Sequence, residues 1–293
     1  MSRFADSHPI VSAAYFLSIL IFIMFTSNPV LLVMGLVGAV VYCIVLEHIQ
    51  TFIKSIGIYA ILFIMIALTN PLFSHNGVTP LFFINGNAVT LEAILYGIDI
   101  ATMLIAVMLW FRCFNNVMTS DKLLFIMGGL SPKIALVVSS ALRFIPLFKA
   151  QSKKIRQTQK AMGLFTSDSW IHRIRGNIRI FSALVTWSLE NAIDTGSSMR
   201  GRGYSLKGKS HFSMFRFRCS DVIMMILIIV LDAVVATIML TGRLDFAFYP
   251  SVTILKQDIY FYVAIIAFFA LAFLPVILEM KEKLLWTYYK SKI

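Results

Sequence analysis

Six stretches of mostly apolar residues, each 18 to 20 residues long, constrain the fold of this chain more than any other feature. An α-helix rises about 1.5 Å per residue, so about 20 apolar residues cross the roughly 30 Å hydrocarbon layer of a membrane. The stretches cover residues 10–27, 29–46, 52–69, 93–111, 222–240 and 259–278. The sequence therefore predicts an all-α integral membrane protein with about six transmembrane helices. The first two stretches, within residues 10–46, are short and could instead form a shallower hairpin.

The composition supports a membrane protein and argues against an ordinary soluble enzyme. Hydrophobic residues make up 59% of the 293 residues, charged residues only 14%, and the mean hydropathy is +0.83. Soluble domains typically carry about 25% charged residues. The three cysteines, Cys43, Cys113 and Cys219, lie far apart without a CxxC pair, so they are interpreted as small apolar residues rather than as a disulfide framework or a zinc site.

Charge is concentrated in one block between the fourth and fifth apolar stretches. Residues 143–218 hold 15 Lys or Arg and 3 acidic residues, which accounts for the whole net charge of +12. Cytoplasmic segments next to spans are enriched in Lys and Arg, whereas the segment 70–92 contains neither. The prediction is therefore a multi-pass protein of a prokaryotic plasma membrane with both termini cytoplasmic. It divides into N-terminal transmembrane helices (1–142), a cytoplasmic region (143–218), and C-terminal transmembrane helices with a tail (219–293).

Two long amphipathic helices are predicted around the basic block. The first begins near Pro132, has a kink near Pro146, and ends near Gly163. Its basic residues recur at helical spacing and form one stripe: Lys149, Lys153, Arg156 and Lys160. Anionic lipid headgroups alone could account for such a stripe.

The second helix is predicted to start near Ser167 and Asp168, which suit a helix N-terminus. One apolar face is formed by Ile171, Ile174, Ile178, Phe181 and Val185. The helix is expected to end near Arg200, followed by the glycines of Gly201-Arg202-Gly203. The first helix ends in a tripeptide of similar form, Ala161-Met162-Gly163.

One motif matches a nucleotide-binding signature in letters only. Residues 203–210 fit GxxxxGK[ST], the phosphate-binding loop that normally joins a buried strand to a helix. Here the preceding residues are polar and helix-like, so ATP binding by this chain is not expected. Histidines lack metal-binding spacing, and Asp232, within the fifth stretch, is interpreted as a hydrogen-bonded helix contact. No cofactor or metal is predicted.

Four segments in this order resemble the transmembrane T component of energy-coupling factor transporters, the CbiQ/EcfT-like family of vitamin and metal uptake systems. The similarity covers most of the chain. The segments are Asn70-Pro-Leu-Phe-Ser-His-Asn-Gly, Met118-Thr-Ser-Asp-Lys-Leu-Leu, Arg143-Phe-Ile-Pro, and Ser198-Met-Arg-Gly-Arg-Gly-Tyr204.

The resemblance implies a role for the two tripeptides. In that family, two cytoplasmic coupling helices end in an Ala-Arg-Gly-like signature whose arginines dock into two ABC-type ATPase subunits. Gly201-Arg202-Gly203 matches the second signature, whereas Ala161-Met162-Gly163 has methionine in the place of the arginine. A less acidic groove on the partner, or Lys160 beside Met162, could account for this difference. Lys153, Arg156 and Lys160 are expected to provide a supporting basic face.

The resemblance also implies that the chain transmits ATP-driven motion to a small substrate-binding membrane subunit, within the lipid bilayer and without nucleic acid or enzymatic activity of its own. An alternative is a membrane enzyme that acts on an anionic lipid or prenyl phosphate, but the basic block offers only three acidic residues for such chemistry. A third possibility is a permease with its own substrate pathway. Asp99 and Asp232 provide few polar groups for that function.

Overall fold

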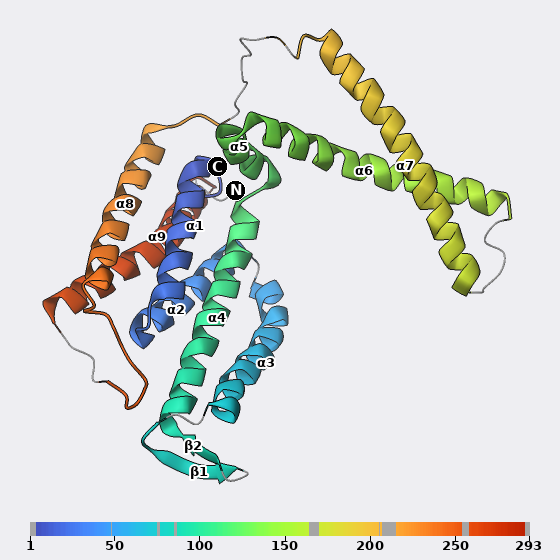
Figure 1. Ribbon diagram of the computed structural model, residues 1–293. Helices are drawn as coiled ribbons and strands as arrows, with labels where there is room; N and C mark the ends of the chain where they lie inside the picture. Colours follow the sequence, from blue (N-terminus) through green and yellow to red (C-terminus); the bar gives the residue numbers. More distant parts are fainter. Residues whose placement is uncertain are drawn as a thin grey trace. The chain divides into compact units, whose positions relative to one another are not determined.

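The structure, a computed structural model, describes residues 4–47, 49–74, 77–84, 87–163, 170–204, 206, 215–253 and 258–290. These residues form helices and one two-stranded antiparallel sheet (Figure 1). The elements are α1 (Pro9–Phe25), α2 (Pro29–Leu46), α3 (Ile49–Phe73), β1 (Pro80–Ile84), β2 (Asn87–Thr90), α4 (Leu91–Val117), α5 (Ser120–Leu130), α6 (Pro132–Ala161), α7 (Trp170–Gly201), α8 (Cys219–Leu240) and α9 (Ile259–Lys290).

The all-α membrane architecture predicted from the apolar stretches is confirmed. Within the described residues, six helices are long and apolar enough to cross a membrane: α2, α3, α4, α6, α8 and α9. The set differs from the prediction at one place. The helix in the first stretch, α1, has only 17 residues because the chain turns at Thr26 to Asn28 and Pro29 opens α2, whereas α6 contains an apolar first half that qualifies.

The chain forms two compact units, one of residues Met1–Leu123 with Phe215–Ile293, and one of residues Leu124–Met214. The first contains α1 to α4, the hairpin, α8 and α9, and the second contains most of α5 together with α6 and α7. The three-part division based on charge stays a prediction. Helix α6 is continuous through Pro146, so apolar and basic residues of the second unit share one helix.

An aromatic cluster fills the core of the first unit. Trp110 of α4 is fully buried, and its indole Nε1 donates a hydrogen bond of 3.0 Å to the Gly35 carbonyl of α2. Tyr15 of α1 packs edge-on against Trp110 and donates to the Leu271 carbonyl of α9 at 3.1 Å. Phe4, also fully buried, packs edge-on against Tyr15. These contacts join α1, α2, α4 and α9 around one centre.

The short segment before α1 connects several elements of the first unit. The backbone N–H of Phe4 donates to Glu279 of α9 at 3.3 Å, and that of His8 donates to Asp221 of α8 at 3.4 Å. The Lys122 ammonium of α5 donates to the carbonyl of Ala5. Lys122, Asp221 and Glu279 are all buried, and a buried charged group is costly unless it is paired. These hydrogen bonds therefore hold the segment firmly against α5, α8 and α9.

Asn70, the first residue of a segment that carries the family resemblance, joins α3 to α4. Its amide Nδ2 donates to the Ala93 carbonyl at 2.7 Å, and Gly97 lies one turn further along α4. A Cβ added at Gly97 would lie 2.5 Å from the Ala67 carbonyl oxygen of α3. The two backbones thus approach closely at this crossing, as small residues allow in membrane proteins.

We expect Gly97→Ala to lower the free energy of unfolding by about 1 to 3 kcal/mol, the usual range for overpacking a tight site. The clash involves backbone on both sides, so no side-chain rotation relieves it. Thermal unfolding of the purified chain in mild detergent measures the effect. Gly57→Ala in α3 is the matched control, since nothing lies within 4 Å of its added Cβ. Equal midpoints for the two variants would contradict the close approach.

Candidate functional site

Helix α6 ends at the first predicted tripeptide in a hydrogen-bonded cap. Ala161 is its last helical residue and Met162 is the C-cap, whose N–H donates to the Thr158 carbonyl at 3.1 Å. The N–H of Gly163 donates to the Lys160 carbonyl at 3.0 Å, with a φ of +75°. Glycine adopts this left-handed conformation without strain. The cap leaves the Met162 side chain 69% exposed.

Helix α7 ends at the second predicted tripeptide in the same way. Gly201 is its last helical residue, and the N–H of Arg202 donates to the Ser198 carbonyl at 3.1 Å. The N–H groups of Gly203 and Tyr204 donate to Arg200 at 3.0 Å and Met199 at 3.1 Å, which is the Schellman pattern. Gly203 has a φ of +76°. Arg202 is exposed.

Met162 and Arg202 therefore occupy equivalent positions on two helices. Each is the residue between the last helical residue and a glycine with a left-handed conformation. A side chain there lies at the helix end, where the unpaired carbonyls carry partial negative charge. A cation is favoured at such a position, and Arg202 provides one, whereas Met162 provides a flexible apolar side chain.

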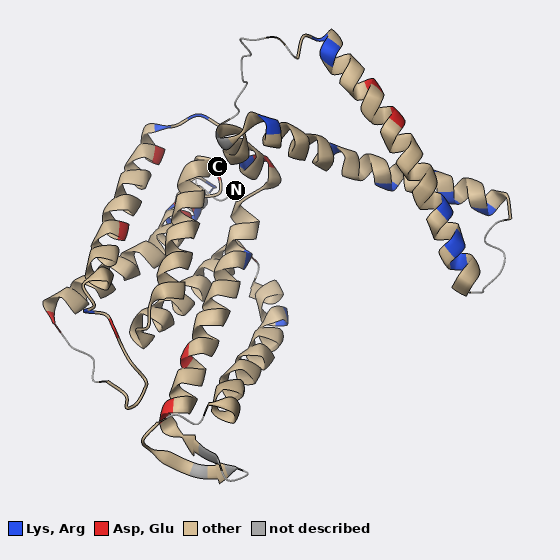
Figure 2. Cartoon of the chain, viewed as in Figure 1, with Lys and Arg blue, Asp and Glu red and all other residues tan. Residues whose placement is uncertain are grey.

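The predicted basic face of α6 is exposed, but one of its members contacts α7. Lys153 and Lys160 are exposed, and the guanidinium Nη2 of Arg156 donates to Asn177 Oδ1 of α7 at 3.1 Å. Phe148 of α6 packs edge-on against Trp187 of α7 with ring centroids 5.5 Å apart. These two contacts show that α6 and α7 cross antiparallel. Figure 2 shows how the basic residues of this unit are distributed along both helices.

The predicted apolar face of α7 is largely exposed among the described residues of the second unit. Most of its large apolar residues are exposed, and α6 covers only a small part of the helix, around Gly176 and Ile180. The apolar first half of α6 is also exposed, which the sequence analysis did not single out although its residues recur at helical spacing. The exposed large apolar residues are Ile134, Val137, Leu142, Ile145 and Leu147 on α6, and Trp170, Ile171, Ile174, Ile178, Phe181, Val185, Leu189 and Ile193 on α7. Exposed apolar surface of this kind indicates contact with lipid or with another protein.

Several predicted features of this region lie outside the described residues. Ser167 and Asp168, the predicted start of the second helix, are among them, and the described helix begins at Trp170. Most of the 203–210 motif also lies outside the described part. Its first glycine, Gly203, follows the C-terminal end of α7 rather than a strand. The helix end carries partial negative charge, which is unfavourable for a phosphate group.

Comparison with known proteins identifies a family for most of the chain. Residues 2–214 match the family model CbiQ, described as cobalt transport protein. A similar protein is the energy-coupling factor transporter transmembrane protein EcfT of Listeria innocua serovar 6a, 36% identical over 102 residues, which are 34% of this chain and 38% of that protein. EcfT of Lactobacillus helveticus is 34% identical over 93 residues, 31% of this chain and 34% of its own length. The chain thus spans a little over a third of the length of the curated relatives it matches.

Proposed function

This chain belongs to the CbiQ family of cobalt transport proteins, and from that premise we propose that it is the transmembrane coupling subunit, or T component, of an energy-coupling factor transporter. In this function it transmits motion between ATPase subunits and a substrate-binding membrane subunit. The family is one of transport components rather than enzymes. The proposed cargo is a vitamin or a metal ion, bound by the separate membrane subunit.

The observation that carries the proposal is the pair of similar helix ends. Ala161-Met162-Gly163 and Gly201-Arg202-Gly203 each end a long helix at a glycine with a left-handed conformation, and Met162 and Arg202 are exposed. Two equivalent projections on one chain suit two similar partners, such as the paired subunits of an ABC-type ATPase. The guanidinium of Arg202 can pair with a carboxylate through two parallel hydrogen bonds.

The two contacts are proposed to differ in strength. Met162 carries no charge, and its side chain has three rotatable bonds. It therefore suits an apolar pocket of adaptable shape. Lys160 and Lys153 lie exposed on the same helix and supply positive charge near this end. The subunit that meets α6 is therefore expected to offer a less acidic groove than the subunit that meets α7.

The uncovered apolar faces of α6 and α7 support the second half of the proposal. A membrane subunit or the lipid surface can cover these residues, since neither exposes them to water. When ATP binding draws the two ATPases together, the helix ends docked in them move, and the apolar faces carry that motion to the bound membrane subunit. Long helices of 30 and 32 residues are suited to transmit it.

The distribution of basic residues supports one orientation of the chain in the membrane. Because Lys and Arg accumulate in cytoplasmic segments, the second unit is proposed to lie on the cytoplasmic side of a prokaryotic plasma membrane, with both termini on that side. This orientation brings the two helix ends to the compartment where ATP is present. Cysteine-accessibility labelling of single exposed positions on either side of the membrane tests it.

The proposal is tested by affinity purification of the tagged chain from its native membrane in mild detergent, followed by mass spectrometry and an ATPase assay. The expected result is two ATPase chains and one small membrane protein that purify together with this chain, with ATP hydrolysis in the complex. If the chain instead purifies alone and does not hydrolyse ATP, the result would contradict the proposal. It would favour the alternative of a membrane enzyme that acts on an anionic lipid.

A further inference from the structure

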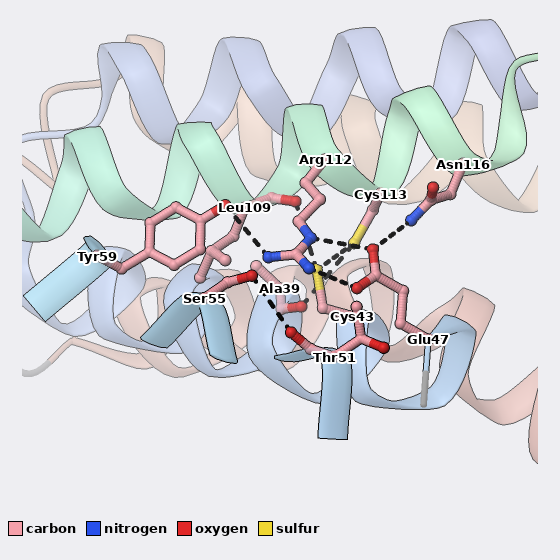
Figure 3. Close-up of polar contacts among 10 residues, drawn as sticks. All are labelled: Ala39, Cys43, Glu47, Thr51, Ser55, Tyr59, Leu109, Arg112, Cys113 and Asn116. Atoms are coloured by element: carbon pink, nitrogen blue, oxygen red, sulfur yellow. Dashed lines mark hydrogen bonds and ion pairs between the residues drawn. The ribbon is translucent and has the colours of Figure 1, made fainter. Parts of the chain in front are cut away.

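Two buried cysteines from different membrane helices face each other in the first unit. The Sγ atoms of Cys43 in α2 and Cys113 in α4 lie 2.9 Å apart, and both side chains are fully buried (Figure 3). We propose that they form an oxidisable dithiol, which a lipid-soluble hydroperoxide converts to a disulfide that fastens α2 to α4. This proposal does not depend on the transport function.

The contacts of both thiols show that the two helices run parallel and in register. Cys43 Sγ lies 3.6 Å from the Leu109 carbonyl of α4, and Cys113 Sγ lies 4.0 Å from the Ala39 carbonyl of α2. Each thiol thus reaches the carbonyl four residues before the other cysteine. One turn further along, Glu47 after α2 contacts Asn116 of α4. The register therefore places Cys43 opposite Cys113.

Small residues bring the two backbones close enough for a disulfide. Ala39 lies one turn before Cys43, and its carbonyl is in contact with Cys113, while the Gly35 carbonyl one turn earlier accepts from Trp110 of α4, so small residues of α2 lie along this contact. Each thiol is within reach of the backbone of the other helix. A disulfide needs its sulfurs about 2.05 Å apart, so the sulfurs have to move together by less than 1 Å from their present separation.

The proposed reaction has two steps. One thiolate attacks the O–O bond of the hydroperoxide, forming a sulfenic acid (S–OH) and releasing an alcohol once the alkoxide takes up the thiol proton. The second thiol sulfur then attacks the sulfenic sulfur, the S–S bond forms, and the hydroxyl leaves as water with the second thiol proton. Overall, two thiols lose two electrons and two protons, and the hydroperoxide is reduced to alcohol and water.

The location of the pair selects the oxidant. Both sulfurs lie between membrane-spanning helices and are shielded from water, so an apolar hydroperoxide reaches them through the lipid more readily than a charged oxidant. The disulfide closes a loop of 70 positions in the chain, which includes all of α3. Oxidation therefore restrains α2, α3 and α4 together.

The test uses the full chain in its native membranes, treated with cumene hydroperoxide, then denatured and labelled with N-ethylmaleimide for mass spectrometry. Cys43 and Cys113 should lose labelling together, and a linked peptide lighter by two hydrogens should appear and vanish with dithiothreitol. Disulfide formation also constrains the unfolded chain, so the midpoint of thermal unfolding should rise on oxidation and fall on reduction.

Single variants separate a dithiol from independent oxidation of each cysteine. In Cys43→Ala or Cys113→Ala, the remaining thiol has no neighbour to displace the sulfenic hydroxyl. Its sulfenic acid should therefore accumulate and be trapped by dimedone, with no linked peptide, whereas in the wild type the adjacent thiol consumes it at high effective concentration. Exposed Cys219 reports that oxidant is active. Full labelling of Cys43 and Cys113 after Cys219 is oxidised, or equal trapping of sulfenic acid by dimedone in the wild type and the single variants, would overturn the proposal.

Discussion

Replacement of Arg202 by glutamate is expected to release the ATPase subunit proposed to dock at α7 while the chain stays in the membrane. The change puts a negative charge at a helix end that already carries partial negative charge, and it removes the guanidinium proposed to pair with a carboxylate of that subunit. Loss of one partner of such an interface pair costs about 2 to 5 kcal/mol, or about a 30-fold or larger loss of affinity. The rate of ATP-driven substrate uptake should fall by at least the same factor as the affinity.

Two variants on the same helices serve as controls for Arg202→Glu. Arg179→Glu makes the same charge change on α7 but far from the helix end, so it should leave ATPase binding within about threefold, as for a surface charge. Met162→Ala removes no charge and should weaken binding less than Arg202→Ala. Affinity of the purified chain for the ATPase subunits gives the comparison. Equal losses for Arg179→Glu and Arg202→Glu would mean that net charge, rather than the capped arginine, holds the ATPases.

The second large effect is expected where α2, α3 and α4 meet. Arg112 of α4 forms a two-bond ion pair with Glu47, from Nε to Oε1 at 2.9 Å and from Nη2 to Oε2 at 2.5 Å, with both side chains less than 20% exposed (Figure 3). The guanidinium also lies over the rings of Phe52 and Tyr59. Removal of one charge leaves the other poorly solvated. We expect Arg112→Ala to lower the free energy of unfolding by about 2 to 4 kcal/mol, between the ranges for buried and exposed pairs.

The same pair predicts how stability depends on pH. The hydrogen bond from Arg112, with a smaller contribution from Asn116, lowers the pKa of Glu47, and partial burial opposes this shift. Because the pKa is lower in the folded state, the stabilisation is complete above the ordinary glutamate value of about 4.3 and is lost as the pH falls through the folded-state value. Thermal unfolding in detergent, measured between neutral and acidic pH, reports this loss.

Two further variants isolate the ion pair. Glu47→Gln keeps the size of the side chain and removes the titration, so its stability should vary less with pH than that of the wild type in this acidic range. The double variant Arg112→Ala with Glu47→Gln should be more stable than the sum of the single effects predicts, because neither charge is then left alone. Additive effects and an unchanged pH profile would show that the pair contributes little.

Local features of the candidate site were predictable from the sequence. Helix caps depend on hydrogen bonds among residues within about six positions, so the glycines of Ala161-Met162-Gly163 and Gly201-Arg202-Gly203 were sufficient to indicate both helix ends. The start of α6 at Pro132 followed from Ser131-Pro132 in the same way. The docking roles of these residues, in contrast, stay predictions until partners are tested.

Contacts between distant parts of the chain were not predictable. Glu47 and Arg112 each stand near the end of an apolar stretch, on the side predicted to be cytoplasmic, and this was the one available signal for their pairing. Cys43 and Cys113 gave no such signal, and they were interpreted as separate small apolar residues, whereas the structure places their sulfurs in contact. The spacing of 70 residues contains no information on which helices become neighbours.

The sequence alone thus determined the membrane class, the course of most spans, the basic block and the form of two helix ends. These properties follow from hydrophobicity, charge and hydrogen bonding along one short segment. Only the tertiary structure decided that α2 packs in parallel register on α4, which brings both the dithiol and the ion pair together. In a membrane every spanning helix is apolar, so hydrophobicity does not select neighbours, and the fit of small residues and a few polar contacts does.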